Sequence, residues 1–249
     1  MKEYSGFAQV YDMFMDNIPY KKWGKYLISL LRSQGVDSGI VAELGCGTGQ
    51  MTRLLRDAGY DMIGIDNSPD MLGVARGREE DESILYLLQD MRSFELYGTV
   101  AAIVSVCDSL NYLTNPEDLY KVFKLAKNYL DPGGVMIFDM NTKYYYSHVV
   151  ADNTICENRE EGSFIWENEY NEQTFINTSY LTIYHKIESG ATQIYNRLEE
   201  EHKQRGYNSG EVLHHARRAG LTPVCLYEAF TRKAPDRTTE RMYFILKNV

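Results

Sequence analysis

Three glycines in one short stretch, Gly45, Gly47 and Gly49, separate an apolar segment from a segment with helical character. The stretch from Val41 to Gln50 reads VAELGCGTGQ. Glycine lets a backbone approach a ligand closely, and N–H groups at the start of a helix form a polar cradle. The spacing therefore predicts a turn that holds a nucleotide-like ligand.

Two classes of ligand use such turns, and the neighbouring acids discriminate between them. The dinucleotide fingerprint is G-x-G-x-x-G, whereas Gln50 stands here where its last glycine would fall. Asp66 ends the next predicted strand, where a carboxylate can accept both hydroxyls of a ribose in either class. Glu43, just before the turn, would repel a pyrophosphate and attract an ammonium or a sulfonium.

A further acid follows the third predicted strand. Asp90 can accept a hydrogen bond from an adenine amino group, and the Met91 N–H can donate to the ring. Together these features favour an adenosyl ligand that carries positive charge. NAD, with oxidoreductase chemistry, stays as the alternative.

The elements that must position these residues alternate between short apolar runs and amphipathic stretches, which is typical of a parallel α/β sheet. Strands are expected at residues 39–44, 60–65, 84–89, 100–107, 135–139, 223–230 and 240–247, with helices at 50–58, from 69, at 116–130 and at 209–219. From about residue 155 to 205 the apolar residues instead recur at every second position, which predicts three or four antiparallel strands.

We therefore predict a doubly wound α/β core that carries an inserted antiparallel β-sheet. The expected units are an N-terminal helical lid (1–37), a cofactor-binding core (38–150 and 206–249) and an inserted substrate or oligomerisation subdomain (151–205).

Five motifs carry a resemblance to a known family: ELGCGTG (43–49), GIDNSPDML (64–72), QDM (89–91), DSLNYL (108–113) and PGGVMIFD (132–139). The sequence resembles the class I S-adenosylmethionine-dependent methyltransferases. The resemblance implies a Rossmann-like sheet of seven mostly parallel strands, with S-adenosylmethionine as the cofactor and S-adenosylhomocysteine as its product.

The resemblance also implies roles for particular residues. The methionine part of the cofactor would lie beside Glu43, Gly45, Cys46 and Gly47, and its ribose beside Asp66. The adenine would lie beside Asn67, Met71, Asp90 and Met91. Cys107 and Asp108 would form the floor of the pocket near the methionine part. The opening YSGFAQVYDMFM and the late segment 199–221 are similar to bacterial amino-sugar N-methyltransferases. That subgroup implies that Tyr4, Tyr11 and Trp23 cover the methionine end.

The sequence says less about the methyl acceptor, and about the residues that bind it, than about the cofactor. An amine needs no strong base during attack, whereas a hydroxyl acceptor gains from a general base. His202 and Tyr112 are the candidate catalytic residues, and Trp166, Tyr170, Arg205 and Tyr207 are candidate substrate residues. Seven acids against one base at residues 152–172 would favour a cationic acceptor. We expect a small-molecule substrate, with a nitrogen acceptor preferred over oxygen.

The composition argues against several other classes of protein. The net charge of −9 and the lack of a basic run argue against nucleic acid, and no apolar run is long enough to span a membrane. The four cysteines are far apart, so neither a metal site nor disulfides are expected. We expect a cytoplasmic protein, and the inserted sheet offers an edge or face for a homodimer, with the oligomeric state left open. A cofactor-binding protein without turnover is the non-enzymatic alternative.

Overall fold

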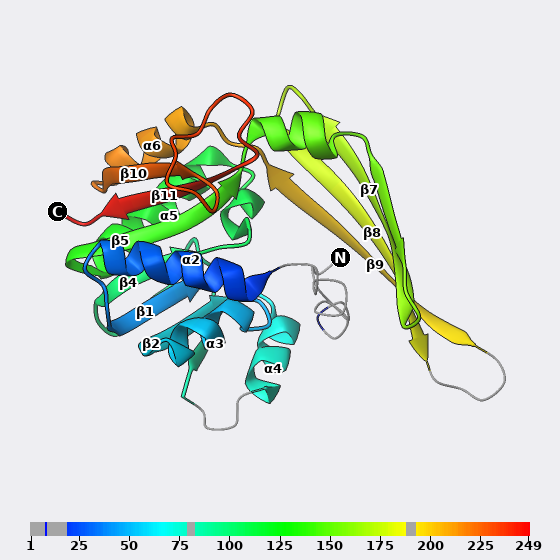
Figure 1. The fold of residues 1–249 in the computed structure, drawn as a ribbon, viewed down its shortest axis with the longest axis horizontal. Coiled ribbons are helices and arrows are strands. Elements are labelled where there is room, and N and C mark those ends of the chain that lie inside the picture. Colours follow the sequence, from blue (N-terminus) through cyan, green and yellow to red (C-terminus); the bar gives the residue numbers. More distant parts are fainter. Residues whose placement is uncertain (1–7, 9–18, 79–82, 188–192) are drawn as a thin grey trace.

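The computed structural model describes residues 8, 19–78, 83–187 and 193–249. Its centre is a seven-stranded sheet in the order β10-β11-β5-β4-β1-β2-β3 (Figure 1). The strands are β1 (Gly39–Leu44), β2 (Tyr60–Asp66), β3 (Leu85–Leu88), β4 (Val100–Ser105), β5 (Leu130–Asn141), β10 (Thr222–Glu228) and β11 (Arg241–Lys247). Strands β1 to β5 pair in parallel, and β11 runs antiparallel to both of its neighbours. The predicted doubly wound, mostly parallel sheet is confirmed.

Helices cover both faces of this sheet. They are α2 (Tyr20–Ser33), α3 (Gln50–Asp57), α4 (Pro69–Gly77), α5 (Pro116–Tyr129) and α6 (Ser209–Arg218), with a short 3₁₀ turn η1 (Ser109–Tyr112) and a π-helical turn η2 (Tyr145–Val150). The starts of α4 and α6 follow from local sequence. Ser68 caps α4 by accepting from the Met71 N–H at 3.2 Å, with Pro69 at the first helical position. Asn208 and Glu211 form a capping box on α6.

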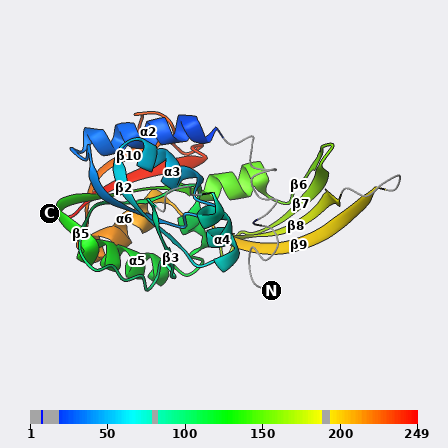
Figure 2. The ribbon, with the colours of Figure 1, turned by 90° about the horizontal axis from the view of Figure 1, so that it is seen from below.

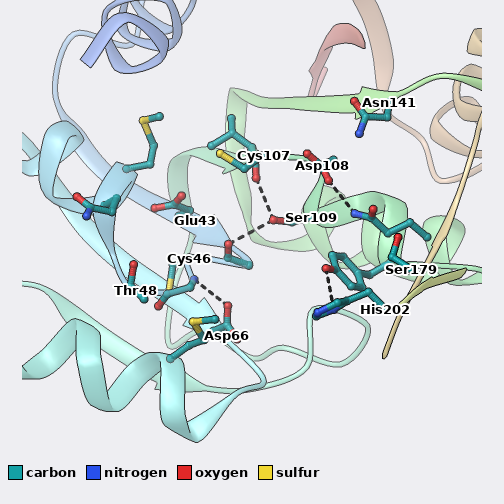
Figure 3. A pocket seen from close by; sticks show the side chains of 18 of the residues that line it. Glu43, Cys46, Thr48, Asp66, Cys107, Asp108, Ser109, Asn141, Ser179 and His202 are labelled. Carbon is teal, nitrogen blue, oxygen red and sulfur yellow. Dashed lines mark hydrogen bonds between the residues drawn. The ribbon is translucent and has the colours of Figure 1, made fainter. Parts of the chain in front are cut away.

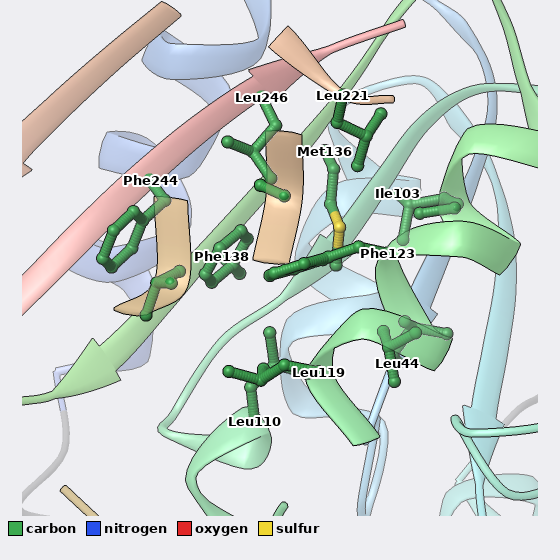
Figure 4. Close-up of a cluster of buried hydrophobic side chains, with 14 of the residues drawn as sticks. Leu44, Ile103, Leu110, Leu119, Phe123, Met136, Phe138, Leu221, Phe244 and Leu246 are labelled. Atoms are coloured by element: carbon green, nitrogen blue, oxygen red, sulfur yellow. The ribbon is translucent and has the colours of Figure 1, made fainter. Parts of the chain in front are cut away.

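The core lies in two layers because the strands are buried on both faces. In β1, Val41 packs with the side chains of α2 and α3, whereas Ala42 packs on the opposite layer with α5 and α6. Figure 4 shows the α5 and α6 layer, where Phe138 stacks on Phe244 with ring centres 4.9 Å apart. Such packing fixes the strand ends that carry the site.

Strand β5 begins earlier than predicted. The residues DPGG were expected to separate a helix from a strand at 135, but β5 already pairs with β4 at Leu130. Gly133 adopts a φ of +82° and donates its N–H to Asn248 O at 2.7 Å, so the turn is folded into an irregular strand start.

The second sheet has the order β6-β7-β8-β9, with all pairs antiparallel. Its strands are β6 (Thr154–Asn158), β7 (Gly162–Asn171), β8 (Ile176–Ile187) and β9 (Ile194–Arg205). This confirms the predicted antiparallel strands. The sheet projects from the core as a curved arm (Figures 1 and 2). In the described ranges, the structure holds no helix that combines the length and the apolar character needed to cross a membrane.

Candidate functional site

A cavity of about 430 Å³ lies between the carboxyl ends of the parallel strands and the second sheet (Figure 3). The sheet contributes one face of its strands: Phe164 and Trp166 from β7, Ser179 from β8, and His202 and Gln204 from β9. The predicted residues found in the cavity wall are Trp23, Glu43, Gly45, Cys46, Gly47, Asp66, Asn67, Met71, Met91, Cys107, Asp108, Tyr112, Trp166 and His202.

The glycine turn is built on backbone that other residues tolerate poorly. Gly45 has a φ of +72°, and a Cβ there would come within 2.7 Å of the Ser109 side chain. Gly47 has a φ of +53°, and a Cβ there would meet nothing within 4 Å. The first glycine is thus required by close packing. The second leaves open space beside the cavity, which fits a ligand held against the backbone.

Asp66 is held in place by backbone donors. The N–H of Gly47 donates to its Oδ2 at 2.8 Å, and the N–H of Ser68 donates to its Oδ1 at 2.9 Å. Burial raises the pKa of Asp66, while these bonds counteract that shift. Each carboxylate oxygen still has capacity for another donor. Two adjacent hydroxyls, as on a ribose, match that capacity.

Glu43 is a buried acid in the cavity wall. Its side chain is 2% exposed and accepts from Thr52 Oγ1 at 2.6 Å. Burial raises the pKa of Glu43 to about 8, with nearby Asp66 contributing. A positive ligand group beside this carboxyl would favour its ionised form.

The expected adenine side is present in part. Asn67, Met71 and Met91 line the cavity, but Asp90 does not. Its Oδ1 accepts from the backbone N–H and from the Nε of Arg92, at 2.8 and 2.9 Å, and these bonds lower the pKa of Asp90. Arg92 thus binds this carboxylate, and adenine contact by Asp90 stays a prediction.

The end of β4 carries strained backbone and an ion-pair network. Cys107 and Asp108 both adopt positive φ, at 59° and 53°, which is uncommon outside glycine and costs about 1–3 kcal/mol per residue. Asp108 Oδ1 pairs with Arg241 at 2.7 Å, and Arg241 also pairs with fully buried Asp139. The Arg241 guanidinium lies 5.0 Å from the ring centre of Trp23. Two carboxylates thus surround one cation at the cavity wall.

The opposite wall contains the two catalytic candidates. Tyr112 OH and His202 Nδ1 lie 3.2 Å apart, at the position shown in Figure 3. Burial lowers the pKa of His202 to about 4, so its imidazole is neutral at pH 7. Phe164 and Trp166 supply the aromatic surface of the same wall.

Three predicted substrate residues lie outside the cavity wall. Tyr207 is fully buried and donates its hydroxyl to Leu113 O, and Arg205 binds Glu211 at 2.9 Å. His202 and Arg205 lie on the same strand, β9. Residues three apart on a strand point to opposite faces, so these two do not share a cleft. Tyr170 lies farther along β7, beyond the lining, and its N–H donates to Asp152. These placements do not support substrate contact.

The acids at residues 152–172 do not face the cavity either. Glu167 and Glu169 are exposed on the face of β7 opposite Phe164 and Trp166, because side chains alternate along a strand. The expected attraction of a cationic acceptor by this run therefore lacks a basis in the cavity. Tyr4 and Tyr11 lie outside the described residues.

Several cavity residues were missed from sequence. They include Asn141, Tyr145, Tyr146, Ser179, Gln204 and Arg241. Gln204 could have been found, since it shares the strand face of His202. Arg241 was harder to find: the only indication is that a cationic residue begins a strand that is otherwise mostly apolar. Asn141 carries no signal beyond its position two residues after Asp139.

Comparison with known proteins places this geometry in a wider group. A family profile described as a methyltransferase domain matches residues 41–134. The chain is 32% identical over 245 residues to YqeM of Bacillus subtilis (strain 168), a protein assigned provisionally as a methyltransferase; the match covers 97% of this chain and 95% of YqeM.

A second relative has a more specific name. It is the dTDP-3-amino-3,4,6-trideoxy-alpha-D-glucopyranose N,N-dimethyltransferase of Streptomyces venezuelae, 29% identical over 58% of this chain and 60% of that protein. Among solved structures, an S-adenosylmethionine-dependent methyltransferase from Clostridium acetobutylicum ATCC 824 superposes with a TM-score of 0.86 at 27% identity, covering 98% of both chains.

Proposed function

The chain belongs to the class I S-adenosylmethionine-dependent methyltransferases, and on that premise we propose that it methylates the nitrogen of a small-molecule amine. The family membership also decides between the two ligand classes that use a glycine turn, in favour of the adenosyl cofactor. The nature of the acceptor and the roles of individual residues belong to the proposal.

The residues proposed to hold the cofactor line the cavity together. Glu43 and the turn at Gly45 and Gly47 would hold its methionine part, and Asp66 its ribose. Asn67, Met71 and Met91 would surround its adenine, and Cys107 and Asp108 would form the floor. When bound, the cofactor would supply a methyl group; a bond from the neutral nitrogen to that methyl carbon would form in line as the C–S bond breaks, with its electron pair staying on sulfur, and the resulting ammonium would lose its proton to solvent.

The burial of His202, a residue that is 7% exposed, favours nitrogen over oxygen because it makes the imidazole a weak base. A general base works best when its pKa lies near the working pH, and His202 at about 4 is a weak base. A hydroxyl would need its proton removed during attack. A neutral amine attacks with its lone pair and needs only alignment and exclusion of water. Holding the two reactants in the reactive geometry can lower the activation barrier by up to about 7–11 kcal/mol.

The charges around the cavity support an amine as well. Glu43, Asp66 and Asp108 line it against a single lining cation, Arg241, in the described wall. Asp108 is paired with Arg241, and a cationic amine that enters the cavity would favour the ionised form of Glu43, so the acids of the wall attract such an amine. The dimethyltransferase of Streptomyces venezuelae, whose name gives an amino sugar as substrate, supports the same acceptor class.

A direct assay tests the proposal. The protein is incubated with S-adenosylmethionine and, separately, benzylamine, glucosamine, benzyl alcohol and phenol, and S-adenosylhomocysteine is quantified. We expect turnover with an amine and at least about tenfold less with the hydroxyl compounds. Preferential turnover of a hydroxyl compound would contradict the nitrogen assignment. Cofactor binding without any turnover would support the non-enzymatic alternative.

The second sheet is also proposed as the surface for a second copy of the chain. Several apolar side chains are exposed on its strands. They are Ile155, Tyr180, Ile187, Ile194 and Tyr195, each between 38% and 48% exposed.

A further inference from the structure

The hydroxyl of Thr52 is directed at the acid beside the glycine turn. Thr52 lies in the first turn of α3, is fully buried, and donates from Oγ1 to Glu43 Oε2 at 2.6 Å. A threonine hydroxyl inside a helix can bond the carbonyl four residues earlier. Here that carbonyl, Thr48 O, accepts instead from Arg53 Nη1 at 3.0 Å. The Thr52 hydroxyl thus links the helix to the end of β1.

This bond determines which oxygen of Glu43 is left for a ligand. Thr52 engages Oε2, whereas no group in the described ranges donates to Oε1. Glu43 lines the cavity, and its Oε1 is not one of the unpartnered side-chain atoms that are closed off in the described interior, so it is accessible from the cavity. Thr52 itself does not line the cavity, so it acts on a ligand there only through Glu43.

The bond also favours one ionisation state of Glu43. A hydroxyl bonds a carboxylate about twice as strongly as it bonds a neutral oxygen, and at a shorter distance. Burial raises the pKa of Glu43, and the Thr52 hydroxyl opposes that shift. A protonated Glu43 would attract a cation less, so the hydroxyl supports the form that a cationic ligand needs.

The other titratable and charged groups that face Glu43 come from three sides. Asp66 at the end of β2 disfavours its ionisation, and Arg53 on α3 favours it. Cys46 in the turn and Cys107 after β4 also lie near, and burial raises the pKa of both thiols well above the usual value, so both are neutral. Thr52 is therefore the one hydrogen-bond donor to this carboxyl in the described part of the chain.

We propose that Thr52 is a positioning residue for S-adenosylmethionine: it holds Glu43 with Oε1 toward the cavity and supports its ionised form beside the positive charge of the cofactor. The inference rests on the role of Glu43 in the proposed function, and it does not depend on the nature of the methyl acceptor.

Thr52→Val keeps the shape of the side chain and removes the donor. The pKa of Glu43 should then rise further, so a larger fraction of the free protein carries a protonated Glu43. At pH 7 the variant should bind S-adenosylmethionine at least about tenfold more weakly than wild type, as expected for the loss of a bond to a charged group. Above pH 8 the wild-type affinity levels off while that of the variant still increases, so the ratio of the two should shrink.

The test is calorimetric titration of wild type, Thr52→Val and Thr52→Ser with S-adenosylmethionine from about pH 6 to about pH 9.5. Titration of the ligand affects all three proteins equally, so the ratios of their affinities report the protein. Thr52→Ser keeps the donor and should stay within about twofold of wild type at each pH. A ratio between wild type and Thr52→Val that does not change with pH would overturn the inference, because lost packing alone acts in that way.

The same substitution in a Glu43→Gln background is the matched control. Residue 43 does not titrate there, so Thr52→Val should change the affinity by one factor at all pH values, and a loss that still depends on pH would also overturn the inference. Thr52→Ala lacks the same donor and replaces Thr52→Val if that variant does not fold. Absence of binding to wild type would refute the cofactor site, and with it the basis of the proposed function, whereas normal binding with a constant ratio refutes the role of Thr52 alone.

Discussion

At the scale of single residues, Glu43 couples ligand binding to protons. Its pKa of about 8 means that most of the carboxyl is protonated at pH 7 when no cation is nearby. A cationic cofactor favours the ionised form and lowers this pKa. Binding should then release a proton, and affinity should increase as pH rises toward about 8 and level off above it.

Calorimetry of S-adenosylmethionine binding at pH 7, in two buffers of different ionisation enthalpy, measures this release. We expect wild type to release a proton that Glu43→Gln does not release. Titration of the ligand's own amino group contributes equally to both proteins, so the difference reports Glu43. Equal proton counts would show that Glu43 does not change ionisation on binding.

From the sequence, the residues proposed to bind the cofactor could be predicted better than those on the acceptor side of the cavity. Glu43, Gly47 and Asp66 stand at strand ends, and the end of a parallel strand is readable from a single run of sequence. Arg205 and Tyr207 were misplaced because Arg205 ends β9 on the face opposite His202 and Tyr207 lies after the strand, where its side chain is fully buried. Asn141 was missed because its place in the cavity wall depends on contacts between segments far apart in the chain, which no local pattern encodes.

At the scale of elements, Arg241 joins the ends of three strands. It stands at the start of β11 and pairs with Asp108 after β4 and with Asp139 in β5. Removing it leaves buried Asp139 without its cation. We expect Arg241→Met to lose about 3–5 kcal/mol in the free energy of unfolding, measured with urea at pH 8.

The loss should be smaller at low pH. Burial already raises the pKa of Asp139, and without Arg241 that pKa rises further. The variant can therefore protonate Asp139 in the folded state as pH falls, so the deficit should shrink between pH 8 and pH 5. Arg241→Lys, which keeps the charge, is the matched control and should lose less. A deficit that does not depend on pH would contradict this explanation.

The two faces of β7 offer another test at this scale. Trp166 lines the cavity, and its neighbour Glu167 is exposed on the other face. Trp166→Ala should raise the KM for benzylamine by at least about tenfold, since burying an aromatic ring contributes about 1.5–3 kcal/mol. Glu167→Gln should leave that KM within about twofold. A comparable effect of both variants would indicate that the acidic outer face, and not the aromatic wall, governs the acceptor.

Element types were predictable where periodicity was strong. The strand at residues 39–44 and the helix that starts after Ser68 agree with the structure, because burial on both faces and a capping serine leave clear patterns. The start of β5 was not predictable, since the Gly133 turn ends regular pairing in most proteins but is accommodated here by a bond to Asn248.

At the scale of the whole molecule, the proposal that the projecting sheet binds a second copy of the chain can be tested. Ile194 at the start of β9 is 48% exposed and pairs across the strand with Ile187. We expect wild type to sediment as a dimer at micromolar concentration and Ile194→Asp to shift it toward the monomer. Val224→Asp changes a similarly exposed residue of β10 and should leave the mass unchanged. A monomeric wild type would contradict the dimer.

The overall architecture was predictable because alternating strands and helices allow few parallel topologies. The position of the second sheet over the strand ends was not, since it depends on packing between segments far apart in sequence. Seven residues of the cavity wall come from that sheet, namely Phe164, Trp166, Ser179, Leu181, Ile183, His202 and Gln204, and their place beside the strand ends was not readable from the sequence.

The most direct test of the account is calorimetric titration with S-adenosylhomocysteine, S-adenosylmethionine and NAD on wild type and on Asp66→Asn. Asp66→Asn preserves size but replaces one carboxylate oxygen with a donor, so it cannot accept both ribose hydroxyls. The account predicts micromolar binding of both adenosyl ligands to wild type, at least about tenfold weaker binding to the variant, and no comparable binding of NAD. Equal affinity of both proteins for the adenosyl ligands would contradict the assignment of this cavity as the cofactor site.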